Sequence, residues 1–304
     1  MTIVILGCSG QVARALSLIE ATGNQSFEFI GRDRCDMSDT SGMEKLLGEL
    51  KPDAIINAAA YTAVDTAQVD QEDARLINVI APAHVAKLAH GWNVPFIHLS
   101  TDYVFDGTKD GPYVETDPTN PVNVYGLTKR DGENEVIASC PNAVVLRTSW
   151  VYSQFGKNFL RTMLTLAQTR DVLTVIDDQW GAPTAAADIA MACLKIALVK
   201  QAGAKPAGIF HMTGGGQTTW RGFAQAAFDK TTQWRGGKMP VVNPIKTADY
   251  PPPSSQTKPT PRPLNSRLNC DLLETQFGIR LPRWEDSLDN TLTALENEFG
   301  AKGE

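Results

Sequence analysis

The feature that most constrains the fold is an apolar run, a glycine-rich turn and a helical pattern at the start of the chain. Thr2–Leu6 is a nearly continuous apolar run, which is typical of a strand buried on both faces of a parallel sheet. The turn that follows reads Gly7-Cys-Ser-Gly10-Gln-Val-Ala13. A strand, a glycine turn and a helix in this order form the context of a dinucleotide-binding fingerprint. We therefore expect a dinucleotide site here, with a purely structural turn as the alternative.

The residues of this turn have separate expected roles. Gly7 permits the tight turn, and Gly10 lets backbone N–H groups approach a pyrophosphate at the helix N-terminus. Ala13 stands where a third glycine is more usual, and its small side chain still allows close packing of the helix on the strand.

The first half of the chain continues to alternate between strand-like and helical patterns. Further strand-like runs occur at Phe27–Ile30, Ala54–Asn57, Phe96–Ser100 and Ala143–Thr148. Helical patterns occur at Gln11–Ala21, Gly42–Leu50, Asp73–His90 and Val124–Ala138. This alternation predicts an α/β fold with a Rossmann-like, doubly wound parallel sheet. We expect residues 1–150 to form the dinucleotide-binding domain, with later segments returning to it, and residues 151–304 to form mainly a smaller substrate-binding lobe.

The second half of the chain is less regular. Helical patterns occur at Asn158–Gln168, Ala186–Val199, Arg221–Lys230 and Trp284–Glu298, and a short apolar run at Gly208–Met212. The proline-rich stretch 250–263 can hold neither a helix nor a central strand. It is either a disordered linker or an ordered loop with a function.

Composition excludes several classes of function. The net charge of −6 and pI near 5.3 argue against a general nucleic-acid or anionic-membrane binder. We find neither a signal peptide nor an apolar run of the roughly 20 residues that span a membrane. The five cysteines are scattered without C-x-x-C spacing, which favours thiols in a reducing compartment, and so a cytoplasmic protein. The four histidines lack ligand spacing; we interpret all as structural and predict no metal site.

A tyrosine and a lysine four positions apart, Tyr125 and Lys129, fall in a helical pattern. This spacing places both on one helix face. A nearby ammonium stabilises a phenolate and lowers the pKa of the tyrosine toward the working range of an acid or base catalyst. Thr101, some two dozen positions earlier, would complete the site by hydrogen-bonding a substrate oxygen. An ordinary surface pair is the alternative.

The choice between NADH and NADPH stays open at this stage. The second strand ends in Ile30-Gly31-Arg32-Asp33-Arg34. Asp33 suits the ribose hydroxyls of NAD, whereas Arg32, Arg34 or Arg14 suits a 2′-phosphate. NADPH is slightly favoured, and solvated loop charge is the alternative.

Longer motifs extend these patterns over nearly the whole chain. They are Asn57-Ala-Ala-Ala-Tyr-Thr-Ala-Val-Asp65, Ser100-Thr-Asp-Tyr-Val-Phe-Asp-Gly107, Tyr125-Gly-Leu-Thr-Lys129, Arg147-Thr-Ser-Trp-Val-Tyr152, Asp178-Gln-Trp-Gly-Ala-Pro-Thr184 and Arg262-Pro-Leu-Asn-Ser-Arg267. Their succession resembles the extended short-chain dehydrogenase/reductases, and within them the reductases of dTDP-linked 4-keto sugars. The departures are Ala13 and Trp180, the latter where the family commonly has another aromatic residue.

The resemblance implies a reaction: reduction by NADPH or NADH of the C4 keto group of dTDP-4-dehydro-6-deoxy-L-mannose. Tyr125 would give its proton to the keto oxygen, and Thr101 would polarise the same carbonyl. Lys129 would lower the pKa of Tyr125 and hydrogen-bond the nicotinamide ribose. Asp102, Trp150 and Arg262 would contact the substrate through its sugar hydroxyls, its deoxyhexose ring and its diphosphate, respectively.

The resemblance also implies cofactor contacts. Gly10, Gln11 and Val12 would meet the pyrophosphate, Asp36 and Met37 would lie beside the adenine, and Ala60, Tyr61 and Thr62 would lie beside the adenosine and nicotinamide side. Some relatives are metal-linked homodimers, so a homodimer and a Mg²⁺ ion enter as expectations from the family alone.

Two other classes of function remain open from sequence. The first is an NDP-sugar epimerase or dehydratase of the same superfamily, which would leave no net consumption of reduced cofactor. The second is a non-catalytic regulatory subunit of methionine adenosyltransferase, because some relatives keep the fold while acting as binding modules.

Overall fold

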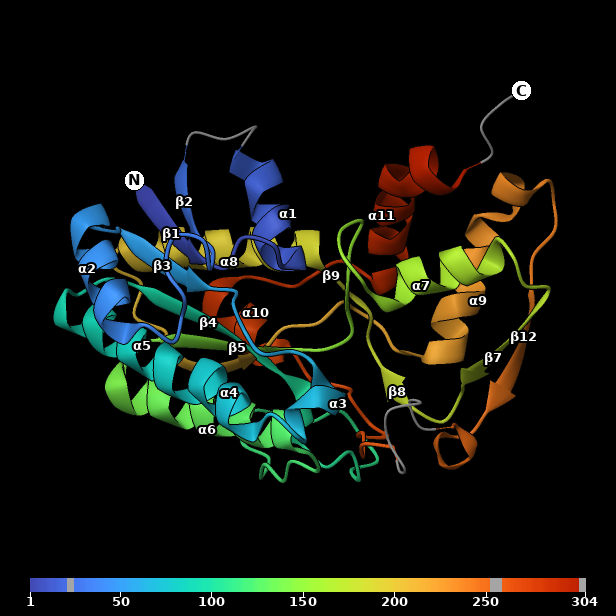
Figure 1. Cartoon of the computed structure of the whole chain (residues 1–304), viewed down its shortest axis with the longest axis horizontal. Coiled ribbons are helices and arrows are strands. Elements are labelled where there is room, and N and C mark those ends of the chain that lie inside the picture. Colours follow the sequence, from blue (N-terminus) through green and yellow to red (C-terminus); the bar gives the residue numbers. More distant parts are fainter. Residues whose placement is uncertain (21–24, 252–258, 301–304) are drawn as a thin grey trace.

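The computed structural model describes residues 1–20, 25–251 and 259–300. Its largest element is a six-stranded parallel sheet in the order β10-β5-β4-β3-β1-β2 (Figure 1). The strands are β1 (Thr2–Leu6), β2 (Ser26–Ile30), β3 (Ala54–Asn57), β4 (Phe96–Thr101), β5 (Val144–Thr148) and β10 (Gly208–His211). The strand order reverses between β1 and β3, which is the switch point of a doubly wound sheet. The predicted fold class is confirmed.

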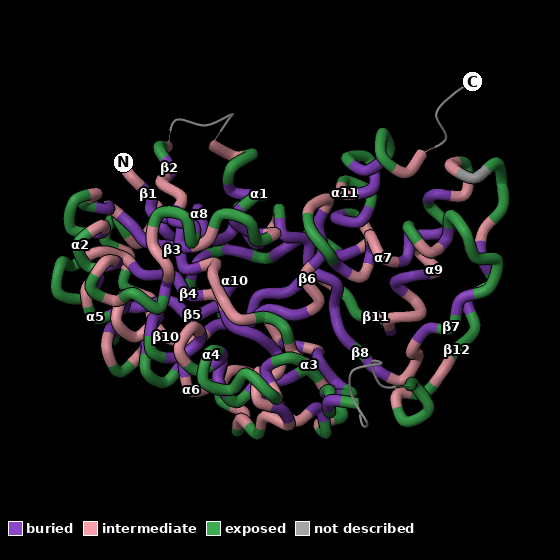
Figure 2. The backbone as a smooth tube through the Cα atoms, in the orientation of Figure 1, coloured by how far each residue is buried: buried purple, intermediate pink, exposed green. Residues whose placement is uncertain are grey.

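Helices cover both faces of this sheet. One face carries α1 (Gln11–Glu20), α8 (Ala186–Gln201) and α10 (Asp271–Phe277), and the other carries α2 (Thr40–Leu50), α5 (Ala81–Gly91) and α6 (Val124–Ser139). In β1, Ile3 and Ile5 belong to the first core, whereas Val4 and Leu6 belong to the second. All four side chains are fully buried, and Figure 2 shows β1 in the colour of buried residues. Burial on alternate sides explains why this strand is apolar throughout.

The pattern predicted as one helix at Asp73–His90 is three successive helical pieces in the structure. These are α4 (Gln71–Arg75), a π-helical turn η1 (Leu76–Ile80) and α5. The wider turn places Asn78 in the interior, where its amide oxygen accepts from the Tyr61 N–H at 2.9 Å. Its amide nitrogen donates to the Tyr61 carbonyl and to Thr128 Oγ1, each at 3.1 Å. Asn78 therefore joins the loop after β3 to α6.

The smaller lobe combines helices with short strands. It contains β6 (Val151–Tyr152), α7 (Phe159–Ala167), β7 (Val172–Ile176), β8 (Trp180–Gly181), β9 (Thr184–Ala185), β11 (Thr218–Thr219), α9 (Trp220–Lys230), η3 (Thr232–Arg235), β12 (Val241–Ile245), η4 (Thr247–Asp249) and α11 (Trp284–Phe299). Two more short helices, α3 (Val64–Ala67) and η2 (Asp102–Val104), belong to loops after β3 and β4. Strands β7 and β12 pair in parallel at the far side of the lobe (Figure 1).

Segments from both halves contribute to the central sheet. Strand β10 lies far beyond residue 150 in the chain, yet it pairs with β5 at the edge of the sheet. The division of the chain at residue 150 stays a prediction. Of the proline-rich stretch, residues 252–258 lie outside the described part of the structure. Among the described residues, no helix is both long and apolar enough to cross a membrane.

A substitution at Gly132 of α6 tests how closely this helix approaches η1. A Cβ at Gly132 would lie 2.0 Å from the Asn78 carbonyl oxygen, whereas a Cβ at exposed Gly48 in α2 would meet nothing within 4 Å. We predict that Gly132→Ala destabilises the fold by about 1–3 kcal/mol, because this overlap with backbone outweighs the better helix propensity of alanine. The control Gly48→Ala should stabilise it by about 0.5–1 kcal/mol. Urea denaturation measures both; equal effects would contradict the close approach.

Candidate functional site

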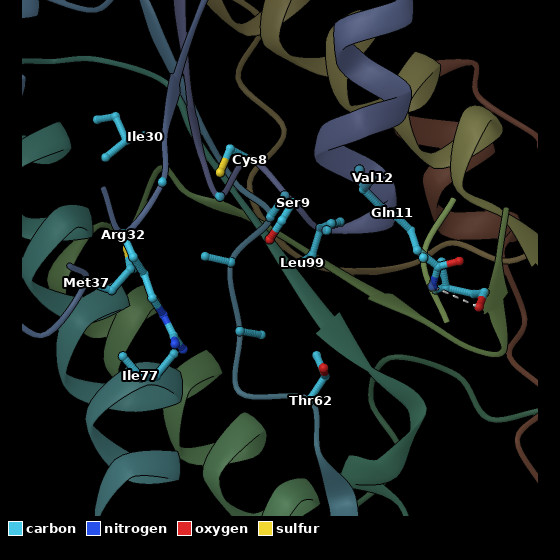
Figure 3. Close-up of a pocket in the computed structure, with 18 of the residues that line it drawn as sticks. Cys8, Ser9, Gln11, Val12, Ile30, Arg32, Met37, Thr62, Ile77 and Leu99 are labelled. Atoms are coloured by element: carbon cyan, nitrogen blue, oxygen red, sulfur yellow. Dashed lines mark hydrogen bonds between the residues drawn. The ribbon is translucent and has the colours of Figure 1, made fainter. Parts of the chain in front are cut away.

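A cavity of about 760 Å³ opens at the carboxyl ends of β1, β2, β3 and β4. Ligands of open α/β sheets bind at this edge, beside the strand-order reversal. Among the described residues, the predicted site residues that line it are Gly7, Gly10, Gln11, Val12, Arg32, Asp36, Met37, Ala60, Thr62, Tyr125 and Lys129. The structure thus brings most of the predicted cofactor residues to one cavity (Figure 3).

The glycine turn has the geometry that a bound pyrophosphate requires. Gly7 has φ +99°, a conformation that residues with a Cβ rarely adopt, and its N–H donates to the Ile30 carbonyl at 2.8 Å. At Gly10, a Cβ would meet only the Ala58 carbonyl oxygen, at 3.9 Å, so the turn beside α1 is open. The first N–H groups of a helix have no partner within it and can bind anions. This turn fits a dinucleotide.

A second observation also fits a bound cofactor. Thr148, at the end of β5, lines the same cavity, and its hydroxyl oxygen is buried without a hydrogen-bond partner among the described residues. A buried polar group in this state carries a free-energy cost that a ligand can offset. Sequence reasoning missed this residue, although it stands inside the quoted motif Arg147–Tyr152.

The opposite end of the cavity carries the residues that would distinguish the two cofactors. Arg32, Asp33, Asp36 and Met37 all line it, and Figure 3 shows Arg32 close to Met37 and Ile77, far from Gln11. The pKa of Asp36 lies below its ordinary value, because the N–H and hydroxyl of Ser38 donate to its carboxylate.

The long helix α6 brings Tyr125 and Lys129 to the cavity on one face. Asn123 caps this helix by accepting from the Gly126 N–H at 2.8 Å, which fixes where it begins. Lys129 is 1% exposed, and its Nζ donates to the Leu99 carbonyl at 2.7 Å. Burial lowers the pKa of Lys129 to about 8, while Glu133 opposes this shift.

The pKa of Tyr125 is raised, whereas the sequence predicted a lowered pKa. Burial raises the pKa of this phenol above its ordinary value, and a hydrogen bond with Thr101 only partly opposes the shift. In the chain by itself, burial therefore outweighs the lowering that was expected from Lys129, and this role of Lys129 stays a prediction. A phenol with a raised pKa stays protonated near neutral pH, which suits a proton donor.

Thr101 and Asp102 lie at the end of β4, beside Tyr125 but outside the lining of the large cavity. Thr101 Oγ1 donates to Asp102 Oδ1 at 3.1 Å and accepts from the Tyr103 N–H at 3.2 Å. Asp102 is 2% exposed, and burial raises the pKa of its carboxyl to about 6, against the hydrogen bonds of Ser266 and Thr101.

The other predicted substrate residues border the same region from the lobe. Trp150 has φ +50°, which is strained for a bulky residue, and its ring stacks on Trp220 with centroids 3.6 Å apart. Arg262 Nη2 contacts Asp65 Oδ2 at 3.0 Å, and its Nη1 contacts the Tyr103 hydroxyl at 3.3 Å. Tyr103 in turn packs edge-to-face on Tyr125. Trp150 and Arg262 also lie outside the lining of the large cavity.

Tyr61, a predicted cofactor residue, and Arg267, the last residue of the motif Arg262–Arg267, have local roles in the structure. The backbone N–H and carbonyl of Tyr61 are both bonded to Asn78, and its hydroxyl donates to Asp70 Oδ2 at 3.0 Å. Arg267 donates to the Asp110 carbonyl and to Asn265 Oδ1. These bonds place Arg267 in a loop-stabilising position.

Gln11 connects the glycine turn to the lobe. Its amide nitrogen donates to the Val151 carbonyl at 3.3 Å, and its amide oxygen accepts from Ser153 Oγ and Asn158 Nδ2, each at 3.0 Å. The segment between them lines the cavity at Gly156 and Lys157, two further residues that sequence reasoning missed.

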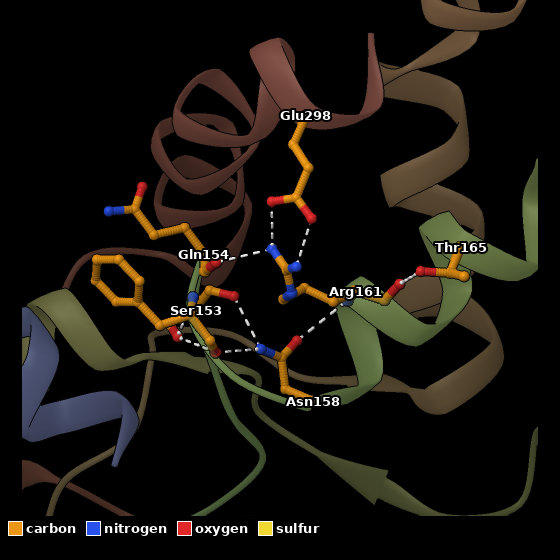
Figure 4. Close-up of polar contacts among 7 residues, drawn as sticks. Ser153, Gln154, Asn158, Arg161, Thr165 and Glu298 are labelled. Carbon is orange, nitrogen blue, oxygen red and sulfur yellow. Dashed lines mark hydrogen bonds and ion pairs between the residues drawn. The ribbon is translucent and has the colours of Figure 1, made fainter. Parts of the chain in front are cut away.

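This lobe segment is itself held by polar contacts (Figure 4). Arg161 donates to the Gln154 carbonyl at 2.8 Å and to both carboxylate oxygens of Glu298. Asn158 caps α7 and donates to the Ser153 carbonyl at 2.8 Å. The segment is therefore fixed to α7 and α11 as well as to the turn.

No group of three or more His, Cys, Asp or Glu side chains is placed to hold a metal ion in the part of the chain that the structure describes. Both the predicted lack of a metal site and the family-based Mg²⁺ stay predictions.

The fold and the cavity define a dinucleotide-binding protein of the Rossmann type. Residues 1–297 match the family described as the RmlD substrate binding domain, and the chain belongs to this family. It is 42% identical over 297 residues to the dTDP-4-dehydrorhamnose reductase of Sinorhizobium fredii, covering 97% of this chain and 98% of that protein. The protein of the same name from Salmonella typhimurium is 40% identical over 308 residues, with the same coverage.

Solved structures give the same result. The crystal structure of a dTDP-4-dehydrorhamnose reductase from Clostridium acetobutylicum superposes with a TM-score of 0.88 at 34% identity, covering 97% of this chain and 100% of that one. The structure of the Bacillus anthracis reductase in complex with NADP has a TM-score of 0.86 at 27% identity, covering 96% and 99%.

The raised pKa of Asp102 predicts a pH-dependent stability. Its carboxyl binds a proton more tightly in the folded chain, at about 6 against an ordinary 3.8. The protonated carboxyl of Asp102 therefore makes its full contribution to the free energy of unfolding below pH 3.8. This contribution is lost as the pH rises past 6, because the carboxyl then ionises in the folded chain as well. We predict that Asp102→Asn gains stability relative to wild type by about 2–3 kcal/mol between pH 4 and pH 7. Chemical denaturation across this range measures the difference.

Asp106, in the same loop, provides a control of opposite sign. Hydrogen bonds from Thr108, Asn120 and Tyr113 lower the pKa of Asp106 to about 2. The ionised carboxylate of Asp106 therefore stabilises the fold above pH 3.8, and this stabilisation is lost as the pH falls toward 2. Asp106→Asn should therefore lose stability relative to wild type above pH 4. A stability difference for Asp102→Asn that stays constant with pH would contradict the assignment.

Proposed function

We propose that this chain is a dTDP-4-dehydrorhamnose reductase, which reduces the C4 keto group of dTDP-4-dehydro-6-deoxy-L-mannose to give dTDP-L-rhamnose. The observation that carries the proposal is the position of Tyr125 and Lys129 at the dinucleotide cavity, with Thr101 hydrogen-bonded to Tyr125. The relatives that share nearly the full length of the chain carry that name. The substrate is thus a dTDP-sugar.

The residues of the site divide the reaction between them. When bound, a reduced nicotinamide cofactor supplies the hydride for the keto carbon. Tyr125 holds a proton at its hydroxyl near neutral pH and gives it to the keto oxygen, so that the carbonyl becomes an alcohol. Thr101, hydrogen-bonded with Tyr125, orients the same oxygen. The ammonium of Lys129, which also lines the cavity, donates to the ribose of the cofactor.

The remaining contacts are assigned by position. Gly7, Gly10, Gln11 and Val12 surround the pyrophosphate, and Asp36 and Met37 lie beside the adenine. Ala60, Tyr61 and Thr62 follow the cofactor toward the nicotinamide.

The substrate residues lie on the lobe side of the site. Asp102 accepts from sugar hydroxyls, Trp150 forms a wall against the deoxyhexose, and Arg262 faces the diphosphate. Guanidinium groups suit bidentate contacts to phosphate.

Arg32 supports NADPH as the preferred cofactor, with NADH also accepted. It lines the adenosine end of the cavity, where a guanidinium would contact a 2′-phosphate. Arg34 is instead paired with Glu28 at 2.8 Å and with the Phe29 carbonyl. The relative from Bacillus anthracis is in complex with NADP.

The proposal extends to location and assembly. All five cysteines are free thiols, which favours a reducing compartment and therefore the cytoplasm. A homodimer remains a family-based expectation.

Incubation of the purified protein with the keto sugar nucleotide and each reduced cofactor tests the proposal directly. We expect stoichiometric oxidation of the cofactor and formation of dTDP-L-rhamnose, identified by mass spectrometry and NMR. Conversion of the sugar without net oxidation would instead identify an epimerase or dehydratase. Binding to methionine adenosyltransferase without any turnover would identify a regulatory subunit.

Tyr125→Phe tests the proton donor. The variant keeps the ring packing on Tyr103 but has no hydroxyl, so we predict that kcat falls roughly 10²–10⁴-fold. The dissociation constant of NADPH, measured by fluorescence titration, should stay within about twofold of wild type, because the ring remains in place. Unchanged turnover would remove Tyr125 from this role.

Arg32→Ala tests cofactor choice, with Arg34→Ala as the matched control. Loss of a charge-assisted contact to the 2′-phosphate should raise the KM for NADPH about 10-fold or more and leave the KM for NADH nearly unchanged. Arg34→Ala should change neither constant, since Arg34 is bonded to Glu28 and Phe29. Steady-state kinetics with NADPH and with NADH measure both KM values. An equal change in the two KM values of Arg32→Ala would refute the role of Arg32.

A further inference from the structure

A chain of buried polar side chains leads from the loop after β3 to the amine of Lys129. Asn57, at the end of β3, and His98, its neighbour in β4, are both 0% exposed. Asn57 Nδ2 lies 3.0 Å from His98 Nδ1, and His98 Nε2 lies 3.3 Å from Lys129 Nζ. From the sequence all four histidines are expected to be structural, but His98 contacts a residue of the proposed active site.

The direction of the first hydrogen bond follows from the loop backbone. The Ala59 N–H donates to Asn57 Oδ1 at 3.1 Å. This bond fixes the orientation of the amide, so that its NH₂ group points to His98. An amide nitrogen can only donate, and His98 Nδ1 must therefore accept.

The direction of the second hydrogen bond follows from the first. A neutral imidazole that accepts at Nδ1 carries its proton at Nε2. Burial and the neighbouring Lys129 hold the pKa of His98 well below its ordinary value, so the ring is neutral. The proton at Nε2 points to Lys129 Nζ. An ammonium has no lone pair to accept this proton, whereas an amine has one.

We propose that His98 is a positioning residue that controls the charge of Lys129: fixed in its Nε2–H form by Asn57, it donates to Nζ and stabilises the amine. The ammonium form loses this bond and keeps its bond to the Leu99 carbonyl, at 2.7 Å. Lys129 thus changes its charge near neutral pH, and turnover depends on pH in that range. This inference rests on the proposed function, in which the ammonium of Lys129 donates to the cofactor ribose beside Tyr125.

The other charged groups around Lys129 do not replace this contact. Within α6, Glu133 favours the ammonium, yet its carboxylate is occupied by Arg147 from β5 and by Ser100 from β4. Asp102, beyond β4, interacts with Tyr125. Of the charged or titratable side chains that the structure describes here, His98 is the one bonded to Nζ.

The tautomer of His98 is measurable without substrate or turnover. In ¹⁵N spectra of the labelled wild-type protein, we expect the His98 ring signals, assigned through their connection to the backbone signals of His98, to show a protonated Nε2 and an unprotonated Nδ1 at neutral pH. A protonated Nδ1, or an imidazolium, would overturn the proposal. This measurement keeps it testable even if a variant at position 98 fails to fold.

Two variants separate control of charge from simple packing. His98→Leu removes the donor, so the pH at which kcat falls to half on the alkaline side should rise by about 0.5–1 unit, the size of one net hydrogen bond. His98→Gln presents an amide oxygen to Asn57 and an amide N–H to Lys129, and it should keep the midpoint within about 0.2 unit, because the bond is retained. If both variants lower kcat at every pH with unmoved midpoints, His98 is structural only.

The outcomes distinguish this inference from the proposed function. If the wild-type protein reduces the sugar but the midpoint and tautomer differ from expectation, the role of His98 fails alone. If the wild-type protein shows no turnover, the proposed function fails, and the tautomer still reports whether the hydrogen-bond chain exists.

Discussion

The position of the site depends on an ion pair beneath it, between Glu133 of α6 and Arg147 of β5. Both side chains are nearly fully buried, and Arg147 Nη2 lies 2.7 Å from Glu133 Oε2. Ser100 of β4 donates to the same carboxylate at 2.5 Å, and Arg147 also reaches His211 of β10. One helix is thereby fixed to three strands. Tyr125 and Lys129 precede Glu133 by two turns and one turn on the same face of α6, so this contact sets their height above the sheet.

Such a pair contributes more to placement than to net stability. Moving two charges out of water costs several kcal/mol per ion, and the attraction between them often does no more than offset that cost. Removing one partner, however, leaves an unpaired buried charge, at about 3–5 kcal/mol. An apolar contact of similar volume would hold α6 to the sheet with less directional preference. We interpret the ion pair as the feature that fixes the rotation and height of α6, whereas apolar contacts elsewhere stabilise the fold.

The sequence predicted the central sheet well, because its strands are apolar runs whose period and flanking turns are local signals. Most of the expected cofactor residues line the cavity, because the ends of parallel strands meet at one edge, whereas Thr148, Gly156 and Lys157 were missed. The sequence did not predict the π-helical turn at Leu76–Ile80, since the buried partners of Asn78 come from distant segments. It also did not predict strands β7 and β12, because each is short and depends on pairing with the other, which is far away in the sequence. The role of His98 depends on the orientation of an amide, which no residue spacing encodes.

The stacked pair Trp150 and Trp220 limits which substitutions this chain can accept. The ring of Trp150 lies so close to β8 that a Cβ at Gly181 would be 2.6 Å from it. A side chain at position 181 is therefore excluded while the tryptophan is present, whatever its chemistry. Replacement of Trp150 first would empty that space and release the constraint. A larger residue at position 181 of this chain thus requires a smaller residue at position 150, either first or at the same time.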